Sequence, residues 1–134
     1  MYSLRAYLNG EIIFESSGKW LYPLFELEDY IRENKIDTAG LFVEDKIAGR
    51  AAAAMMVKFG IRKVRIGLIS SYGAEIFKEH GVEFSYDEYV EKIQCRTEEL
   101  LTPEMTIDGI YDFLRERAGR KGPEGKGFNL IKGG

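Results

Sequence analysis

Two short polar stretches carry the residue types best suited to binding a ligand. Residues 45–50 (DKIAGR) follow the apolar residues 39–43, and residues 70–73 (SSYG) follow the apolar residues 64–69. Polar groups at the ends of parallel strands often face the ligand crevice of an α/β sheet. The expected ligand-binding residues are Asp45, Lys46, Gly49, Arg50, Ser70, Ser71, Tyr72 and Gly73.

Both stretches precede a predicted helix, and the first N–H groups of a helix have no partner within it. Two helix starts that converge on one crevice favour an anion. Lys46 and Arg50 would add positive charge, and Ser70 and Ser71 would donate hydrogen bonds from their hydroxyl groups. The pattern therefore predicts a small anionic or nucleotide-like ligand.

The same residues also have purely structural interpretations. Ser70 or Ser71 would serve as the N-cap of the following helix. The four alanines at residues 51–54 combine high helix propensity with little bulk, which suits close packing against a sheet. Gly49 lets another backbone or a ligand approach the first turn of that helix. Both interpretations stay open at the level of sequence.

His80 and Cys95 are the only residues of their types in the chain. His80 precedes Gly81 and is expected to interact with the last carbonyls of a helix. Cys95 lies beside Arg96, a neighbour that can activate a thiol, although a lone intracellular cysteine is more often unreactive. The chain contains no phosphate-binding loop, dinucleotide fingerprint or Gly-x-Ser-x-Gly motif.

The elements that must position these residues begin with a predicted β-hairpin. Residues 3–8 and 11–15 are short apolar runs joined by Asn9 and Gly10, a pair suited to a tight turn. Residues 22–34 show helical spacing of apolar side chains. Strands at residues 39–43 and 64–69 then flank the alanine helix. This βαβ unit predicts a mixed sheet with helices on both faces.

The second half of the chain continues the alternation. A helix is expected at residues 72–79, with Gly81 as its C-cap, and a strand at residues 82–84. A short helix at 85–93, a loop at 94–102 and a helix from Pro103 or Thr106 to about residue 118 complete the expected domain, residues 1–118. Residues 119–134, with the sequence GRKGPEGKGFNLIKGG, include six glycines and are expected to form a flexible tail.

Composition limits the classes of partner. The chain has 134 residues, 45% of them apolar, and a net charge of −3, which favours one globular domain and neither nucleic acid nor an acidic membrane as a partner. With no apolar run long enough to span a bilayer, no leader pattern and a single cysteine, we expect a cytoplasmic protein.

The order of elements, together with VEDKIAGRAAA at the second helix and LISSYGAEIF at the third, resembles an uncharacterised domain-of-unknown-function family over about residues 4–114. Members of that family have a cytidine deaminase-like fold. The resemblance implies a three-layer α/β fold in which an N-terminal β-hairpin precedes βαβαβ. It says nothing about the reaction, because fold does not determine function.

Zinc deaminases carry His-x-Glu or Cys-x-Glu at the second helix and Pro-Cys-x-x-Cys at the third. Residues 45–50 and 70–73 hold no such ligands, so we expect no zinc, no cofactor and no zinc-dependent deamination. The family often has a Cys-Pro-Met-Glu-like segment before its last helix. This chain has Thr102-Pro103-Glu104-Met105 there, which removes the thiol and adds Thr102 and Glu104 to the expected ligand-binding residues.

Three functions agree with these patterns. The first is a metal-free deaminase-like domain that binds a small ligand at the starts of the second and third helices. The second is a metal-free enzyme with Asp45 or Glu104 as acid/base and Ser70 or Ser71 as donor or nucleophile. The third is a homo-oligomeric structural module that associates through exposed aromatic residues. The aromatic residues considered are Trp20, Tyr22, Phe25, Tyr72, Phe84, Tyr86 and Tyr89.

Overall fold

The computed structural model describes residues 1–120, so all but the first two residues of the expected tail at 119–134 lie outside the described part. One mixed sheet of five strands has the order β2-β1-β3-β4-β5. Its strands are β1 (Leu4–Leu8), β2 (Glu11–Ser16), β3 (Leu41–Ala48), β4 (Lys63–Ser70) and β5 (Glu83–Val90). The helices are α1 (Tyr22–Asn34), the 3₁₀ turn η1 (Thr38–Gly40), α2 (Arg50–Lys58), α3 (Ser71–Glu79), α4 (Arg96–Leu100) and α5 (Ile107–Arg117).

The opening hairpin and the first helix lie where the sequence predicts them. Asn9 and Gly10 have φ angles of 54° and 82°, as a tight turn between antiparallel strands requires. Helix α1 has the predicted bounds, with Pro23 in its first turn. The α/β class and the alternation of strands and helices after the hairpin are confirmed.

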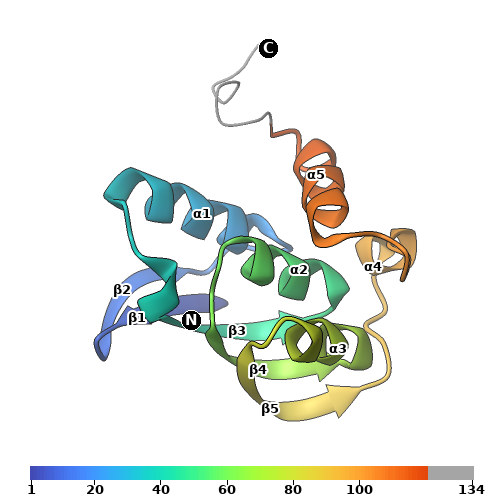
Figure 1. The fold of residues 1–134 in the computed structure, drawn as a ribbon, viewed down its shortest axis with the longest axis horizontal. Coiled ribbons are helices and arrows are strands. Elements are labelled where there is room, and N and C mark those ends of the chain that lie inside the picture. The colour runs from blue at the N-terminus through green and yellow to red at the C-terminus, as the bar shows by residue number, and fades with distance from the viewer. Residues whose placement is uncertain (121–134) are drawn as a thin grey trace.

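Helices α1, α2 and α3 lie on one side of the sheet in Figure 1, whereas we expected helices on both faces. The topology explains the difference. Each of the three helices joins parallel strands, and each connection steps in the same direction across the sheet, from β2 to β3, β4 and β5. Three right-handed crossovers in one direction place all their helices on one face. Helix α5 packs on the outer side of α2.

The other face of the sheet carries charged and aromatic side chains. Arg5 and Glu15 form an ion pair at 2.5 Å, the Tyr7 hydroxyl donates to Glu44 at 2.7 Å, and Arg65 pairs with Asp87. Such a polar face needs no covering layer in water.

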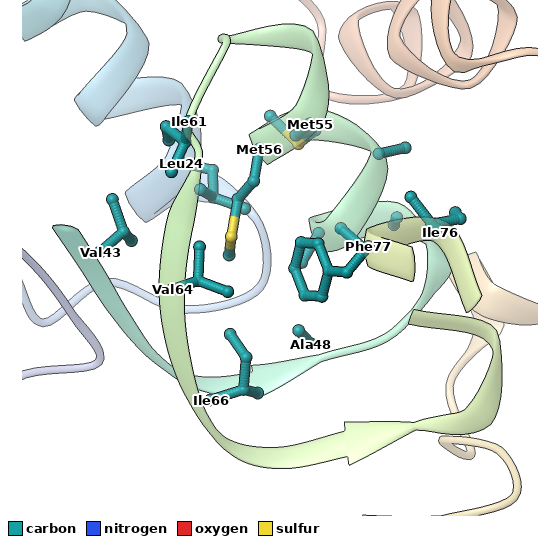
Figure 2. Packing of buried hydrophobic residues seen from close by; sticks show 14 of the residues in the cluster. Leu24, Val43, Ala48, Met55, Met56, Ile61, Val64, Ile66, Ile76 and Phe77 are labelled. Atoms are coloured by element: carbon teal, nitrogen blue, oxygen red, sulfur yellow. The ribbon is translucent and has the colours of Figure 1, made fainter. Parts of the chain in front are cut away.

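The hydrophobic core lies between the sheet and the helices. Figure 2 shows Met56 and Phe77, from α2 and α3, meeting Val64 and Ile66 of β4. All four alanines of residues 51–54 are buried, because α2 lies between the sheet and α5. The packing interpretation of the alanine run is therefore confirmed.

Three predicted boundaries were wrong. Strand β3 continues to Ala48 instead of ending at residue 43. Residues 85–90 of the helix expected at residues 85–93 belong to β5, because residues 83–90 pair with β4 along their whole length. The loop expected at 94–102 contains helix α4. Helix α5 follows Thr106, whose hydroxyl accepts the Gly109 N–H at 3.0 Å, as predicted for a start at Thr106.

None of the helices in residues 1–120 is long and apolar enough to cross a membrane.

Candidate functional site

Asp45 and Lys46 lie inside β3 and not at a helix start. Asp45 stands between Leu4 and Ile66 of the neighbouring strands, both fully buried on the helix side of the sheet. Loss of solvation raises the pKa of Asp45 to about 7, although hydrogen bonds with the backbone of Ile47 and Lys46 oppose the shift. Lys46 is exposed, and its Nζ lies 4.9 Å from the centre of the Tyr2 ring.

The start of α2 is occupied by a carboxylate of the protein itself. The two oxygens of Glu98, from α4, accept the backbone N–H groups of Arg50 and Ala51, each at 2.8 Å. An anion at this helix start was predicted, and the anion found there is an internal side chain. No sequence signal pointed to Glu98, because residues 94–102 were expected to form a loop.

Gly49 makes room for this carboxylate. A Cβ at position 49 would lie 2.6 Å from the carboxyl carbon of Glu98, which is far inside van der Waals contact. The φ of Gly49 is −104°, which any residue can adopt, so the glycine is needed for space and not for its backbone conformation.

Arg50 is a buried cation at the same helix start. The residue is 7% exposed, its guanidinium lies 4.3 Å from the centre of the Tyr72 ring, and one Nη donates to the Leu101 carbonyl at 3.3 Å. Within residues 1–120, no carboxylate lies within ion-pair distance of this guanidinium. Among the same residues only one hydrogen bond of this guanidinium is found, so most donors of the buried Arg50 have no partner there.

The start of α3 lies beside that of α2. A Cβ on Gly73 would lie 2.9 Å from the Ala48 carbonyl oxygen, so α3 can approach the end of β3 closely only because residue 73 is glycine. Buried Ser70 caps the helix by accepting the Gly73 N–H at 3.1 Å, which confirms the capping alternative. Ser71 donates its hydroxyl to the Glu91 carbonyl at 2.7 Å.

A cavity of about 340 Å³ opens beside these helix starts. Arg50 and Tyr72 lie in its wall, and Thr102 and Glu104 are exposed next to Pro103, another wall residue. The structure thus brings together Gly49, Arg50, Tyr72 and Gly73, and it places Asp45 and Lys46 within β3. The wall residues that sequence reasoning missed are Lys92, Ile93, Gln94, Glu98, Glu99 and Leu101.

The His80 ring donates through Nδ1 to the Ile76 carbonyl at 3.0 Å, as expected for the end of α3. Among residues 1–120, no cluster of three or more histidine, cysteine, aspartate or glutamate side chains has a geometry that could hold a metal ion.

Comparison with known proteins gives a family without an assigned activity. The family TM1506, described as a domain of unknown function (DUF1893), matches residues 2–113. The crystal structure of a DUF1893 family protein (TM1506) from Thermotoga maritima matches with a TM-score of 0.73 and 30% identity, over 87% of this chain and 80% of that chain. A comparison with curated proteins finds no match. The predicted membership of an uncharacterised family is confirmed: the chain belongs to the DUF1893 family.

Proposed function

We propose that this domain binds a small anionic ligand, a carboxylate or phosphate, in the cavity beside α2 and α3. The observation that carries the proposal is Arg50, a buried guanidinium without an acidic partner in the described part of the chain, in the wall of a cavity of about 340 Å³. Burying an unpaired charge is costly, and an anionic ligand would compensate for that cost.

The contacts of Arg50 prepare it for this role. Tyr72 stacks on one side of the guanidinium, and the Leu101 carbonyl accepts one of its five N–H groups. These two contacts fix the plane of the guanidinium group. Its remaining N–H donors suit the paired oxygens of a carboxylate or phosphate. Lys92 in the same wall adds a second cation.

The ligand anion is held by side chains and not by the start of α2. Glu98 already accepts the first N–H groups of that helix, so Arg50 and Lys92 are the groups available to an anion. Binding of the anion by these two side chains requires no metal ion. The proposed kinship with deaminases rests on the sequence resemblance alone, and the anion site does not depend on it.

Thermal unfolding with inorganic phosphate tests the proposal. Phosphate should raise the Tm of the wild type, because a ligand that binds only the native state stabilises it. Arg50→Met should abolish this rise while raising the Tm of the free protein, since it replaces an unpaired buried charge with an apolar chain. Arg50→Lys should keep part of the phosphate-induced increase in Tm, because lysine keeps the positive charge but lacks the planar guanidinium group.

Arg115→Met is the matched control. Arg115 is also 7% exposed, but it lies in α5 and bonds to Glu28 and Tyr111. This variant should unfold at a lower temperature and still respond to phosphate. Equal phosphate shifts in the wild type and in both methionine variants would place the binding elsewhere and overturn the proposal.

The two alternatives have less support. Within the described residues, no hydrogen bond joins any two of Asp45, Ser71 and Glu104, and the hydroxyl of Ser71 is already donated to a backbone carbonyl. Among residues 1–120, these three side chains therefore form no acid/base or nucleophilic pair that would favour the enzyme. An oligomeric module stays a prediction, with the exposed rings of Tyr86 and Tyr89 on the edge strand β5 as its contact.

A further inference from the structure

A second cavity, of about 250 Å³, lies on the other side of Glu98. It shares Ile93 and Glu98 with the first cavity, so the two spaces adjoin. Its walls are mainly apolar, with Trp20 and Ile47 among them. Among the described residues of its wall only Glu98 is charged, and the oxygens of Glu98 are bonded to the start of α2.

Trp20 is held firmly in this wall. Its indole N–H donates to the Thr97 hydroxyl at 2.9 Å, and its ring packs edge-on against Tyr22 with centroids 5.1 Å apart. Its backbone has a φ of 57°, a left-handed conformation that is rare for a bulky residue. Contacts must maintain such a conformation, and strained residues of this kind cluster at binding sites.

We infer that the second cavity receives a planar apolar ring carried by the same anionic ligand. The inference rests on the proposed function and narrows it to aromatic acids and aromatic phosphate esters, with the anion at Arg50 and the ring beside Trp20. Three features of the described wall residues support it: the two cavities adjoin, the cations Arg50 and Lys92 line the first and no cation lines the second, and the second is mainly apolar.

The volume suits a single ring. An apolar cavity of about 150 Å³ is enough to bind benzene in a protein interior. The second cavity, at about 250 Å³, holds one substituted ring. A ring that stacks on or packs against Trp20 removes apolar surface from water and adds affinity to the ionic contact with Arg50.

Trp20 also provides the measurement, because it is the only tryptophan of the chain. Phenyl phosphate should change the Trp20 fluorescence and bind about tenfold or more tightly than inorganic phosphate, which should leave the fluorescence unchanged. A buried ring contributes about 1.5–3 kcal/mol, which corresponds to at least a tenfold gain.

Ile47→Thr and Ile12→Thr form a matched pair of variants. Both isoleucines lie in strands and are about half exposed, at 51% and 49%, but only Ile47 lines the second cavity. Ile47→Thr should weaken phenyl phosphate about fivefold, because it removes roughly 1 kcal/mol of apolar contact, without changing the affinity for inorganic phosphate. Ile12→Thr should change neither affinity.

The outcomes separate this inference from the proposed function. If inorganic phosphate binds through Arg50 but phenyl phosphate binds no more tightly and leaves Trp20 unaffected, the ring subsite is wrong and the anion site stands. If neither compound binds in an Arg50-dependent way, both are wrong. If the two threonine variants weaken phenyl phosphate equally, the ring does not lie beside Ile47.

Discussion

Asp45 and Lys46 are neighbours in sequence, yet they face opposite sides of the sheet. Successive side chains of a strand alternate between its faces. Asp45 therefore shares the helix side with Leu4 and Ile66, while Lys46 shares the open side with Tyr2. A carboxyl group among buried apolar neighbours favours its neutral form, which is why the pKa of Asp45 is raised to about 7.

The pH dependence of stability follows from this shift. The pKa of Asp45 rises from 3.8 in the unfolded chain to about 7 in the native protein. Its contribution to stability is therefore complete below pH 3.8 and is lost as the pH rises through about 7. Asp45→Asn should flatten this dependence and raise the free energy of unfolding at pH 8 by about 1–3 kcal/mol.

Urea unfolding at pH 5 and pH 8 measures the effect. Asp112→Asn, at an exposed position of α5, should behave like the wild type. If Asp45→Asn loses as much stability between the two pH values as the wild type does, Asp45 is ionised throughout and its native pKa is not raised.

The chemistry of single residues was easier to predict from sequence than their position. Ser70 is the helix cap, and Arg50 faces a cavity, as the residue types indicate. Asp45 was predicted to follow its strand and instead lies inside it, because the apolar run ends at Val43 while the hydrogen-bonded ladder continues to Ala48. Pairing with a distant strand, which the local sequence does not encode, decides where a strand ends.

At the scale of elements, the contact of α4 with α2 determines the form of the site. Helix α4 has five residues, and Glu98 joins it to the first two N–H groups of α2. Sequence reasoning predicted free N–H groups at that helix start. It missed Glu98 because the glutamate is 48 residues from Arg50 in the chain, and local patterns carry no information on such a contact.

A double-mutant cycle tests whether position 49 must be glycine to leave space for the Glu98 carboxylate. Glu98→Ala should cost about 1–3 kcal/mol, because two buried N–H groups lose a charged acceptor. Gly49→Ala should cost a similar amount, because its Cβ would displace the carboxylate. In the Glu98→Ala background, Gly49→Ala should cost nothing or stabilise by a few tenths of a kcal/mol through the unfolded state.

Urea unfolding of the four proteins gives the coupling energy. Glu99→Gln, on the exposed side of the same helix, should leave stability unchanged within about 0.5 kcal/mol. Additive costs for the two alanine substitutions would show that Gly49 is needed for a reason other than the Glu98 carboxylate.

At the scale of the whole molecule, the right-handedness of strand–helix–strand connections explains most of the architecture. The hairpin sets the direction of β1 and β2, and each right-handed crossover then adds a parallel strand on the same side. The order of elements was predictable because periodicity and turn residues are local. The uncovered sheet face follows from the order of strands, which the expectation of two covered faces did not take into account.

From the same architecture we expect α4 to open locally before the sheet does. The central strands β1, β3 and β4 are each paired on both sides, whereas α4 is one short helix that follows the edge strand β5. Regions with few buried contacts open locally at free energies below that of global unfolding. Opening of α4 would release Glu98 from α2 and expose both cavities to solvent.

Native-state hydrogen exchange can detect this opening within α2 itself. The amides of Arg50 and Ala51 bond to Glu98, whereas the amide of Ala53 bonds to the Gly49 carbonyl inside the helix start. Arg50 and Ala51 should therefore exchange together with the Glu99 amide of α4, at a free energy that depends little on low concentrations of urea. Ala53 should exchange with the β3 amides, by global unfolding and with a steep urea dependence. If Ala51 and Ala53 show the same free energy and the same urea dependence, α4 does not open separately, and a ligand would have to enter both cavities without any movement of Glu98.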